Sequence, residues 1–157
     1  MAGRARSFTE TVASLVDTNI LVYRCDPRDP GKREAARTVL RRGEASGELR
    51  IAHQSLVEFV SCMTRSRAGR TPLMTREDAT RQAELFMAEF PVLYPNEHVF
   101  RTGLRGMAAY KLSWFDAHLW AYAEHYGLPE ILSEDFEHER MYGTVKIRNP
   151  FIALGLA

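Results

Sequence analysis

The sequence predicts an α/β domain built on a mostly parallel sheet, with helices covering both faces. Short apolar segments typical of strands alternate along the chain with longer segments of helical periodicity. The chain has 157 residues, 45% of them hydrophobic, which is enough to bury a core without disulfides or a structural metal. No repeat or linker divides it. We therefore expect one domain over residues 12–157, preceded by a flexible N-terminal extension over residues 1–11.

In the first half of the chain, the pattern predicts strands at Val12–Val16 and Leu49–Ala52. Helices are expected near Ile20–Tyr23, around Ala35–Leu40 and at Gln54–Thr64. Two glycines follow the second of these helical segments, and we expect them to end that helix: Gly43 and Gly47.

In the second half, helices are predicted at Thr75–Phe90, after Asn96 and at Ser113–Tyr126, because polar capping residues precede each apolar pattern. Short strands are predicted at Val92–Tyr94, Ile131–Leu132 and Val145–Ile147. The helix after Asn96 is expected to turn one stripe inward, formed by Val99, Phe100, Gly103, Leu104 and Met107. Three aromatic residues are expected mainly in the core: Trp114, Phe115 and Trp120.

Charge and cysteine content exclude several classes of protein. The chain has 21 Lys and Arg residues and 20 Asp and Glu residues, which gives a net charge of +1. This charge argues against a protein that binds nucleic acid over its whole surface. Cys25 and Cys62 cannot form a disulfide scaffold, and we expect both to be buried as small hydrophobes in a reducing cytoplasm. No segment approaches the roughly 20 apolar residues of a membrane span.

Four carboxylates occupy positions where a domain rarely places an acid without a role: Asp17, Glu58, Asp116 and Asp135. Each also has a simpler explanation. Asp17 and Asp116 could cap helices, Glu58 could face solvent, and Asp135 could begin a turn. In a parallel α/β sheet, however, the carboxyl ends of the strands lie at one edge, where such sheets bind ligands. We expect the four acids to converge there.

Carboxylates gathered in one cleft repel each other unless cations lie between them. An all-oxygen set of ligands favours a hard divalent ion, Mg²⁺ or Mn²⁺, over zinc. Neither a nucleotide-binding glycine loop nor a His-Glu-x-x-His motif is present. Metal-assisted hydrolysis of a phosphodiester fits this set of residues best, because one ion activates water and another stabilises the leaving oxygen.

Four segments, in order, resemble the motifs of PIN-domain ribonucleases: LVDTNILVY at Leu15–Tyr23, VEF at Val57–Phe59, SWFDA at Ser113–Ala117 and LSEDF at Leu132–Phe136. The closing segment Val145–Phe151 resembles the ending of VapC-type toxins of bacterial toxin–antitoxin pairs. The resemblance implies a three-layer α/β/α sandwich, Mg²⁺- or Mn²⁺-dependent cleavage of RNA, homodimerisation and neutralisation by an antitoxin protein.

By the same resemblance, Asp17, Glu58, Asp116 and Asp135 would bind the metal. Three further residues would orient these acids by hydrogen bonding: Thr18, Asn19 and Ser133. The alternative is a PIN-like module that binds RNA or a protein without catalysis. A DNA nuclease with the same metal chemistry ranks lower, because the short chain lacks large insertions.

Arginines provide the candidate contacts to RNA phosphates. Arg24 and Arg28 follow Asp17 closely, whereas the others lie beyond Met63, in and after a segment that contains Gly69 and Pro72. This second group comprises Arg65, Arg67, Arg70, Arg76 and Arg81. An arginine-rich helix end is, however, more often a solvated face than a binding surface.

Overall fold

The structure, a computed structural model, describes residues 12–156; the expected extension over residues 1–11 lies outside this range. Within the described residues the strands are β1 (Ser14–Val16), β2 (Leu49–Ala52), β3 (Val92–Leu93), β4 (Glu130–Leu132), β5 (Met141–Tyr142) and β6 (Val145–Arg148). The helices are α1 (Thr18–Cys25), α2 (Pro30–Ser46), α3 (His53–Thr64), α4 (Arg76–Glu89), α5 (Glu97–Tyr110), α6 (Trp114–Tyr126) and the 3₁₀ helix η1 (Ile152–Leu154).

The strands form one sheet in the order β3-β2-β1-β4-β6-β5. Every neighbouring pair is parallel except β5 with β6, which is antiparallel. The predicted α/β class with a mostly parallel sheet is therefore confirmed. β1 lies between β2 and β4, so the chain winds outward in both directions from β1, and the sheet has its topological switch point at the carboxyl end of this strand.

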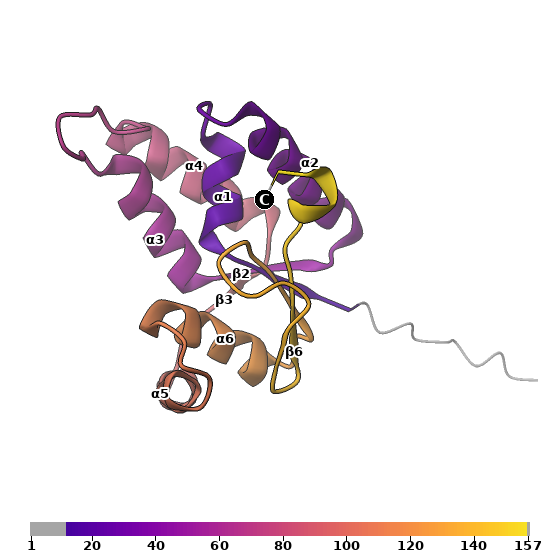
Figure 1. The fold of residues 1–157 in the computed structure, drawn as a ribbon. Helices are drawn as coiled ribbons and strands as arrows, with labels where there is room; N and C mark the ends of the chain where they lie inside the picture. The colour runs from indigo at the N-terminus through magenta and orange to yellow at the C-terminus, as the bar shows by residue number, and fades with distance from the viewer. Residues whose placement is uncertain (1–11, 157) are drawn as a thin grey trace, which may run out of the picture.

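Helices cover both faces of the sheet, which gives three layers (Figure 1). Successive residues of each strand point to opposite faces. Val16, Ile51 and Leu132 belong to the core shared with α1 to α4, whereas Leu15 and Ile131 belong to the core shared with α5 and α6. Both cores are buried against the same short central strands, and this fixes the positions of the residues that follow those strands.

Local capping explains where the helices begin and end. Thr75, Asn96 and Ser113 each accept a hydrogen bond at the N-terminus of α4, α5 and α6, respectively. Gly47 and Gly127 end α2 and α6 in the left-handed conformation, which costs glycine little. These boundaries agree with the sequence expectations.

Gly43 does not end a helix as expected. It lies inside α2, and a Cβ on this residue would lie 2.2 Å from Leu49 Cγ, so glycine is needed for the close approach of α2 to β2. Gly43 therefore serves helix–strand packing rather than helix termination.

The expected inward stripe of α5 is wrong in part. Val99 and Gly103 are buried, but Phe100, Leu104 and Met107 are 49%, 44% and 39% exposed. Phe115 was expected in the core and is also exposed. The sequence pattern correctly identified the apolar side of α5, but α6 covers only part of that side.

Three smaller findings complete the fold. The strand β5 was not predicted, because its two residues carry no detectable pattern. Cys25 and Cys62 are free and half-buried rather than fully buried. Among the helices of residues 12–156, none has the length and apolar character needed to cross a membrane.

Candidate acidic metal site

The candidate site lies at the carboxyl edge of the two central strands. Asp17 follows β1 directly and Ser133 follows β4 directly. Because β1 and β4 pair in parallel, with Val16 opposite Leu132, these two residues become neighbours. The backbone N–H of Asp17 donates to Leu132 O at 3.0 Å, which extends the pairing up to the site.

Asp17 is almost completely buried, with 6% of its surface exposed. Its Oδ1 accepts a hydrogen bond from the Thr18 backbone N–H at 2.6 Å, and its Oδ2 accepts one from Ser133 Oγ at 2.6 Å. Burial nevertheless raises the pKa of Asp17 to about 7, and the charges of Asp135 and Asp116 raise it further against the lowering effect of these hydrogen bonds. Asp17 does cap α1, but desolvation makes its charge costly in a way that capping alone does not explain.

Glu58 lies on α3, half-buried, and Gln54 one turn earlier holds it in place. Gln54 Nε2 donates to Glu58 Oε1 at 2.7 Å and to Phe115 O at 2.9 Å. Burial raises the pKa of Glu58, and the charges of Asp116 and Asp135 raise it further. Glu58 therefore belongs electrostatically to the same site as the other acids.

A histidine completes the support of Gln54. His118 Nδ1 lies 2.7 Å from Gln54 Oε1, and because the amide nitrogen is used on Glu58, the histidine must be the donor. Trp114 stacks on the imidazole with centroids 5.2 Å apart. Burial lowers the pKa of His118, which favours the neutral ring, with its proton on Nδ1.

Asp116 lies in the first turn of α6. This helix ends at Tyr126 and β4 begins at Glu130, so α6 runs back along the sheet and its N-terminus reaches the same edge as Asp17. Burial raises the pKa of Asp116, and the charge of Asp135 raises it further. Its backbone N–H donates to Ser113 Oγ at 3.3 Å, so it is part of a capping arrangement as well as of the acidic site.

Asp135 is exposed at the mouth of the site. Its backbone N–H donates to Ser133 Oγ at 3.0 Å, and the same hydroxyl donates to Asp17. Ser133 thus connects the buried acid to the exposed one. Glu134, between them, instead pairs with Lys32 at 2.7 Å and accepts a hydrogen bond from Tyr23.

The donor set fits a hard, hydrated cation. Within residues 12–156, no three Asp, Glu, His or Cys side chains lie close enough to form a coordination shell by themselves. Mg²⁺ usually keeps several of its waters and contacts one or two carboxylates directly, so acids that do not form a complete shell by themselves still suit it. Asn19 Oδ1 is buried without a hydrogen-bond partner in the described part of the chain, and its amide nitrogen faces Asp17 and Ser133. That oxygen is a further acceptor available to an ion or its waters.

The arginines expected to contact RNA differ in their availability. Arg24 forms a two-bond ion pair with Glu89, at 2.5 and 2.9 Å, and Arg28 pairs with Asp26 at 2.7 Å. Arg65, Arg67 and Arg70 are exposed at the end of α3 and in the loop after it. Of these candidates, the loop arginines retain the freer guanidinium groups.

Gln54 and His118 were missed as site residues. Gln54 lies four residues before Glu58 on the same helix face, a spacing that the sequence contains but that is common in helices. His118 comes from the opposite face of the sheet, and no local pattern connects it to α3.

A family model for the PIN domain matches residues 14–143, most of the chain. The mostly parallel sheet, with helices on both faces, defines the fold class. The match identifies the family: the chain belongs to the PIN domain family. The comparison with curated proteins gives no match.

Solved structures with the same fold are similar at low sequence identity. A toxin–antitoxin complex from Klebsiella pneumoniae is 16% identical, with a TM-score of 0.64 over 88% of this chain and 98% of that chain. VapBC2 from Rickettsia felis, bound to a DNA fragment from its promoter, is 11% identical, with a TM-score of 0.65 over 87% and 98%. Mycobacterium tuberculosis VapC20, described as a sarcin-ricin loop cleaving toxin, is 16% identical, with a TM-score of 0.60 over 78% and 90%.

Proposed function

We propose that the protein is a Mg²⁺- or Mn²⁺-dependent endoribonuclease and the toxin of a type II toxin–antitoxin pair. One observation carries the chemistry: a buried carboxyl, Asp17, whose pKa is raised to about 7 and which is coupled by charge to Asp116 and Asp135. Acids held at this energetic cost at a topological switch point favour a cation-dependent site over a structural one.

Each residue has a definite part in this mechanism. Asp17, Glu58, Asp116 and Asp135 would hold the ion, while Ser133 and the Thr18 backbone orient Asp17. Gln54 fixes the direction of Glu58. The bound ion would lower the pKa of a water and stabilise the leaving oxygen. With the site empty, its negative charges repel a phosphodiester, so we expect substrate to depend on the ion for binding as well as for cleavage.

The partner proposal comes from the similar structures. The solved complexes from Klebsiella pneumoniae and Rickettsia felis contain a toxin with its antitoxin, and their fold covers nearly all of this chain. We infer an antitoxin protein for this chain as well. Co-expression with adjacent small open reading frames should give a stable complex and relieve growth arrest; the absence of both for every adjacent frame would contradict the inference.

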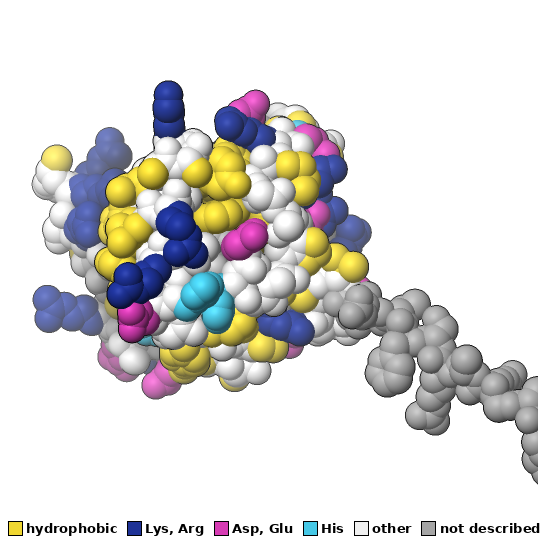
Figure 2. All heavy atoms as spheres, turned by 90° about the horizontal axis from the view of Figure 1, so that it is seen from below, with side chains coloured by type: hydrophobic (Ala, Val, Ile, Leu, Met, Phe, Trp, Pro, Cys, Tyr) yellow, Lys and Arg dark blue, Asp and Glu magenta, His cyan; other side chains and the backbone are white. Residues whose placement is uncertain are grey.

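A homodimer is proposed from the exposed apolar side of α5. Phe100, Leu104 and Met107 lie on this helix, and Phe115 is exposed on α6, which packs against it. Figure 2 looks at the molecule from the side on which α5 and α6 lie and shows hydrophobic side chains exposed there among charged ones. Apolar side chains grouped in this way are typical of interfaces between copies of a chain.

Cleavage of a structured RNA tests the proposed activity. Asp116→Asn and Glu58→Gln should each lower the rate in Mg²⁺ by more than about 100-fold, because even residues that merely support metal ligands change affinity or activity by 10- to 100-fold. Glu137→Gln is the control: this carboxylate is exposed and pairs with Arg140, outside the site. If all three variants cleaved RNA at the wild-type rate, the proposed nuclease activity of this site would be contradicted.

A calorimetric titration with Mn²⁺ distinguishes the nuclease from a non-catalytic PIN-like binding module. The nuclease predicts saturable binding to the wild-type protein that is weakened in Asp116→Asn. RNA binding without Mn²⁺ binding or cleavage would favour the module.

A further inference from the structure

The acid next to Asp135 in the chain, Glu134, is held by a cluster of its own. Tyr23 Oη donates a hydrogen bond to Glu134 Oε1 at 2.5 Å, and Lys32 Nζ forms an ion pair with Glu134 Oε2 at 2.7 Å. Lys32 Nζ also donates to Tyr23 Oη at 3.1 Å. We call these three side chains the Glu134 cluster. It connects the segment after β4 with α1 and α2.

The Glu134 cluster is largely enclosed by the protein. Lys32 Nζ lies 4.7 Å from the centre of the Tyr23 ring and 5.6 Å from that of Phe151, within the range of cation–π attraction. Phe151 is fully buried and packs edge-on against Tyr23. The side chains of Lys32 and Glu134 are only 17% and 18% exposed. Removing one partner of so enclosed a pair leaves a poorly solvated charge, so the cluster holds Glu134 in one position.

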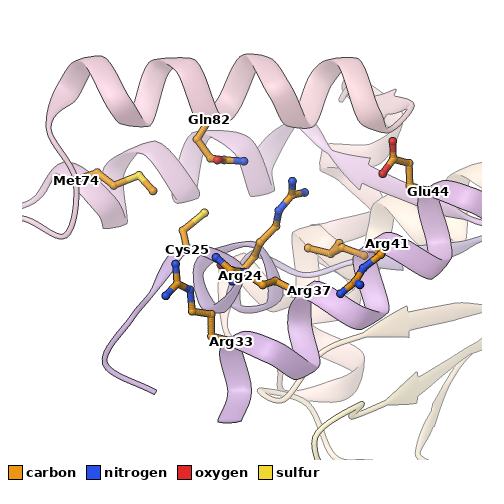
Figure 3. Close-up of a pocket in the computed structure, with 9 residues that line it drawn as sticks. Arg24, Cys25, Arg33, Arg37, Arg41, Glu44, Met74 and Gln82 are labelled. Atoms are coloured by element: carbon orange, nitrogen blue, oxygen red, sulfur yellow. The ribbon is translucent and has the colours of Figure 1, made fainter. Parts of the chain in front are cut away.

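Lys32 lies on a different side of α2 from three arginines of that helix. Arg33, Arg37 and Arg41 are spaced four residues apart and line a cavity between α1, α2 and α4 (Figure 3). The hydrogen bonds of Lys32 instead reach Tyr23 on α1 and Glu134 after β4. The Glu134 cluster is therefore separate from this cavity and adjoins the acidic site.

Glu134 lies between two residues of the acidic site. Ser133 Oγ donates to Asp17 Oδ2 and accepts from the backbone N–H of Asp135. Within the described part of the chain, the Asp135 carboxylate has no hydrogen bond of its own, so its direction depends on the backbone that carries it. Anchoring the side chain of Glu134 restricts rotation of that backbone. The Glu134 cluster therefore controls where Asp135 points.

We propose that Tyr23 and Lys32 are positioning residues of the metal site: by holding Glu134, they direct Asp135 toward the ion and prevent Glu134 from replacing it. This inference rests on the proposed metal-dependent function. Both oxygens of Glu134 are engaged by Tyr23 and Lys32, whereas the exposed carboxylate of Asp135 can contact a cation or its waters. Neighbouring carboxylates compete for the same ion, so fixing one of them decides which acid binds it.

Charge and position predict opposite effects of removing Lys32. Its ammonium pairs with the residue next to Asp135, and the loss of one positive charge near a cation site by itself strengthens cation binding. A released Glu134 that became a ligand would strengthen binding as well. If the Glu134 cluster positions Asp135, removal of Lys32 weakens binding instead. The sign of the change in affinity therefore separates these effects.

Calorimetric titration with Mn²⁺ measures this change. Lys32→Met keeps an aliphatic chain against Tyr23 and Phe151 but removes the charge, and it should weaken Mn²⁺ binding by about tenfold, as for other residues that orient metal ligands. Lys32→Arg keeps a charged donor for Glu134 and should bind Mn²⁺ more tightly than Lys32→Met does. Tyr23→Phe keeps the ring packing and removes only the hydroxyl. It should weaken binding by about threefold, since a neutral donor binds a carboxylate less strongly than an ammonium does.

Arg41→Met is the matched control, because it removes one positive charge and one ion pair, with Glu34, from the same helix. It should bind Mn²⁺ as the wild-type protein does. Unchanged or tighter binding by Lys32→Met, or equal weakening by Lys32→Met and Arg41→Met, would overturn the positioning role alone. Unchanged binding by Tyr23→Phe would overturn it even if Lys32→Met failed to fold. A wild-type protein that binds no Mn²⁺ would contradict the proposed function itself, and the positioning role with it.

Discussion

Asp17 combines two roles that oppose each other energetically. As an N-cap it accepts the Thr18 N–H, which stabilises α1. As a buried acid near Asp116 and Asp135 it resists ionisation, and its pKa rises from 3.8 to about 7. The folded state therefore binds the Asp17 proton more tightly than the unfolded state. The contribution of this residue to stability is fully present below about pH 4 and is lost as the pH rises to about 7.

We predict that Asp17→Asn raises the free energy of unfolding at pH 8 in the absence of metal, by up to about 4 kcal/mol, since each pKa unit corresponds to about 1.4 kcal/mol. The asparagine can still accept the Thr18 N–H, so the cap is retained. At pH 4 the difference from wild type should disappear. Urea unfolding of both proteins in EDTA from pH 4 to pH 8 measures this; a difference between variant and wild type that does not grow with pH over this range would contradict it.

Gln54 tests whether the orientation of Glu58 matters. Gln54→Met keeps the volume but removes the donor to Glu58 and the acceptor for His118. We expect Mn²⁺ affinity to fall by about 10- to 100-fold, as for other residues that orient metal ligands. Ser61→Ala on the same helix, where the hydroxyl accepts only from exposed Arg65, should leave affinity unchanged. Equal affinities for the two variants would assign Gln54 a purely structural role.

At the scale of elements, the contact between α5 and α6 depends on a glycine. A Cβ at Gly106 would lie 2.5 Å from Trp120 Cε3, and Trp120 is itself anchored because its Nε1–H donates to Tyr142 O at 2.9 Å. The ring cannot move away without breaking that hydrogen bond. The close approach of the two helices therefore requires a residue without a side chain.

We predict that Gly106→Ala destabilises the protein by about 1–3 kcal/mol, the usual cost of overpacking. Helix propensity alone predicts the opposite sign, a gain of up to about 1 kcal/mol. Denaturant unfolding therefore separates the two effects by sign. Stabilisation by Gly106→Ala would show that Trp120 can shift at little cost.

Most element boundaries could be predicted because they depend on local signals. Asn96 and Ser113 cap their helices, and Gly127 ends α6, as their positions in the sequence indicated. The exposed side of α5 could not be predicted, because an apolar stripe has the same pattern whether its own fold or another chain covers it. Gly43 shows the same limit: a glycine that permits close packing resembles one that ends a helix.

At the scale of the whole molecule, the apolar side of α5 predicts the oligomeric state. We expect the wild-type protein to sediment as a dimer and Leu104→Lys to sediment as a monomer with an unchanged circular dichroism spectrum, because a buried charge in the interface opposes association. Leu85→Lys on α4 is the matched control, since Leu85 and Leu104 are 46% and 44% exposed. A monomeric wild-type protein would exclude the dimer. Dissociation of the dimer by both substitutions would contradict an interface on α5.

The sequence alone determined the identity and order of the acids, the strand ends and the helix caps, since each depends on residues close together in the chain. It did not determine the order of the strands in the sheet. The pairing of β1 with β4 brings Ser133 onto Asp17, and the return of α6 places His118 against Gln54. Burial of Asp17 and the pairing of Arg24 with Glu89 likewise arise between segments distant in sequence. Desolvation and hydrogen bonding depend on which groups surround an atom in space, and only the folded chain determines those neighbours.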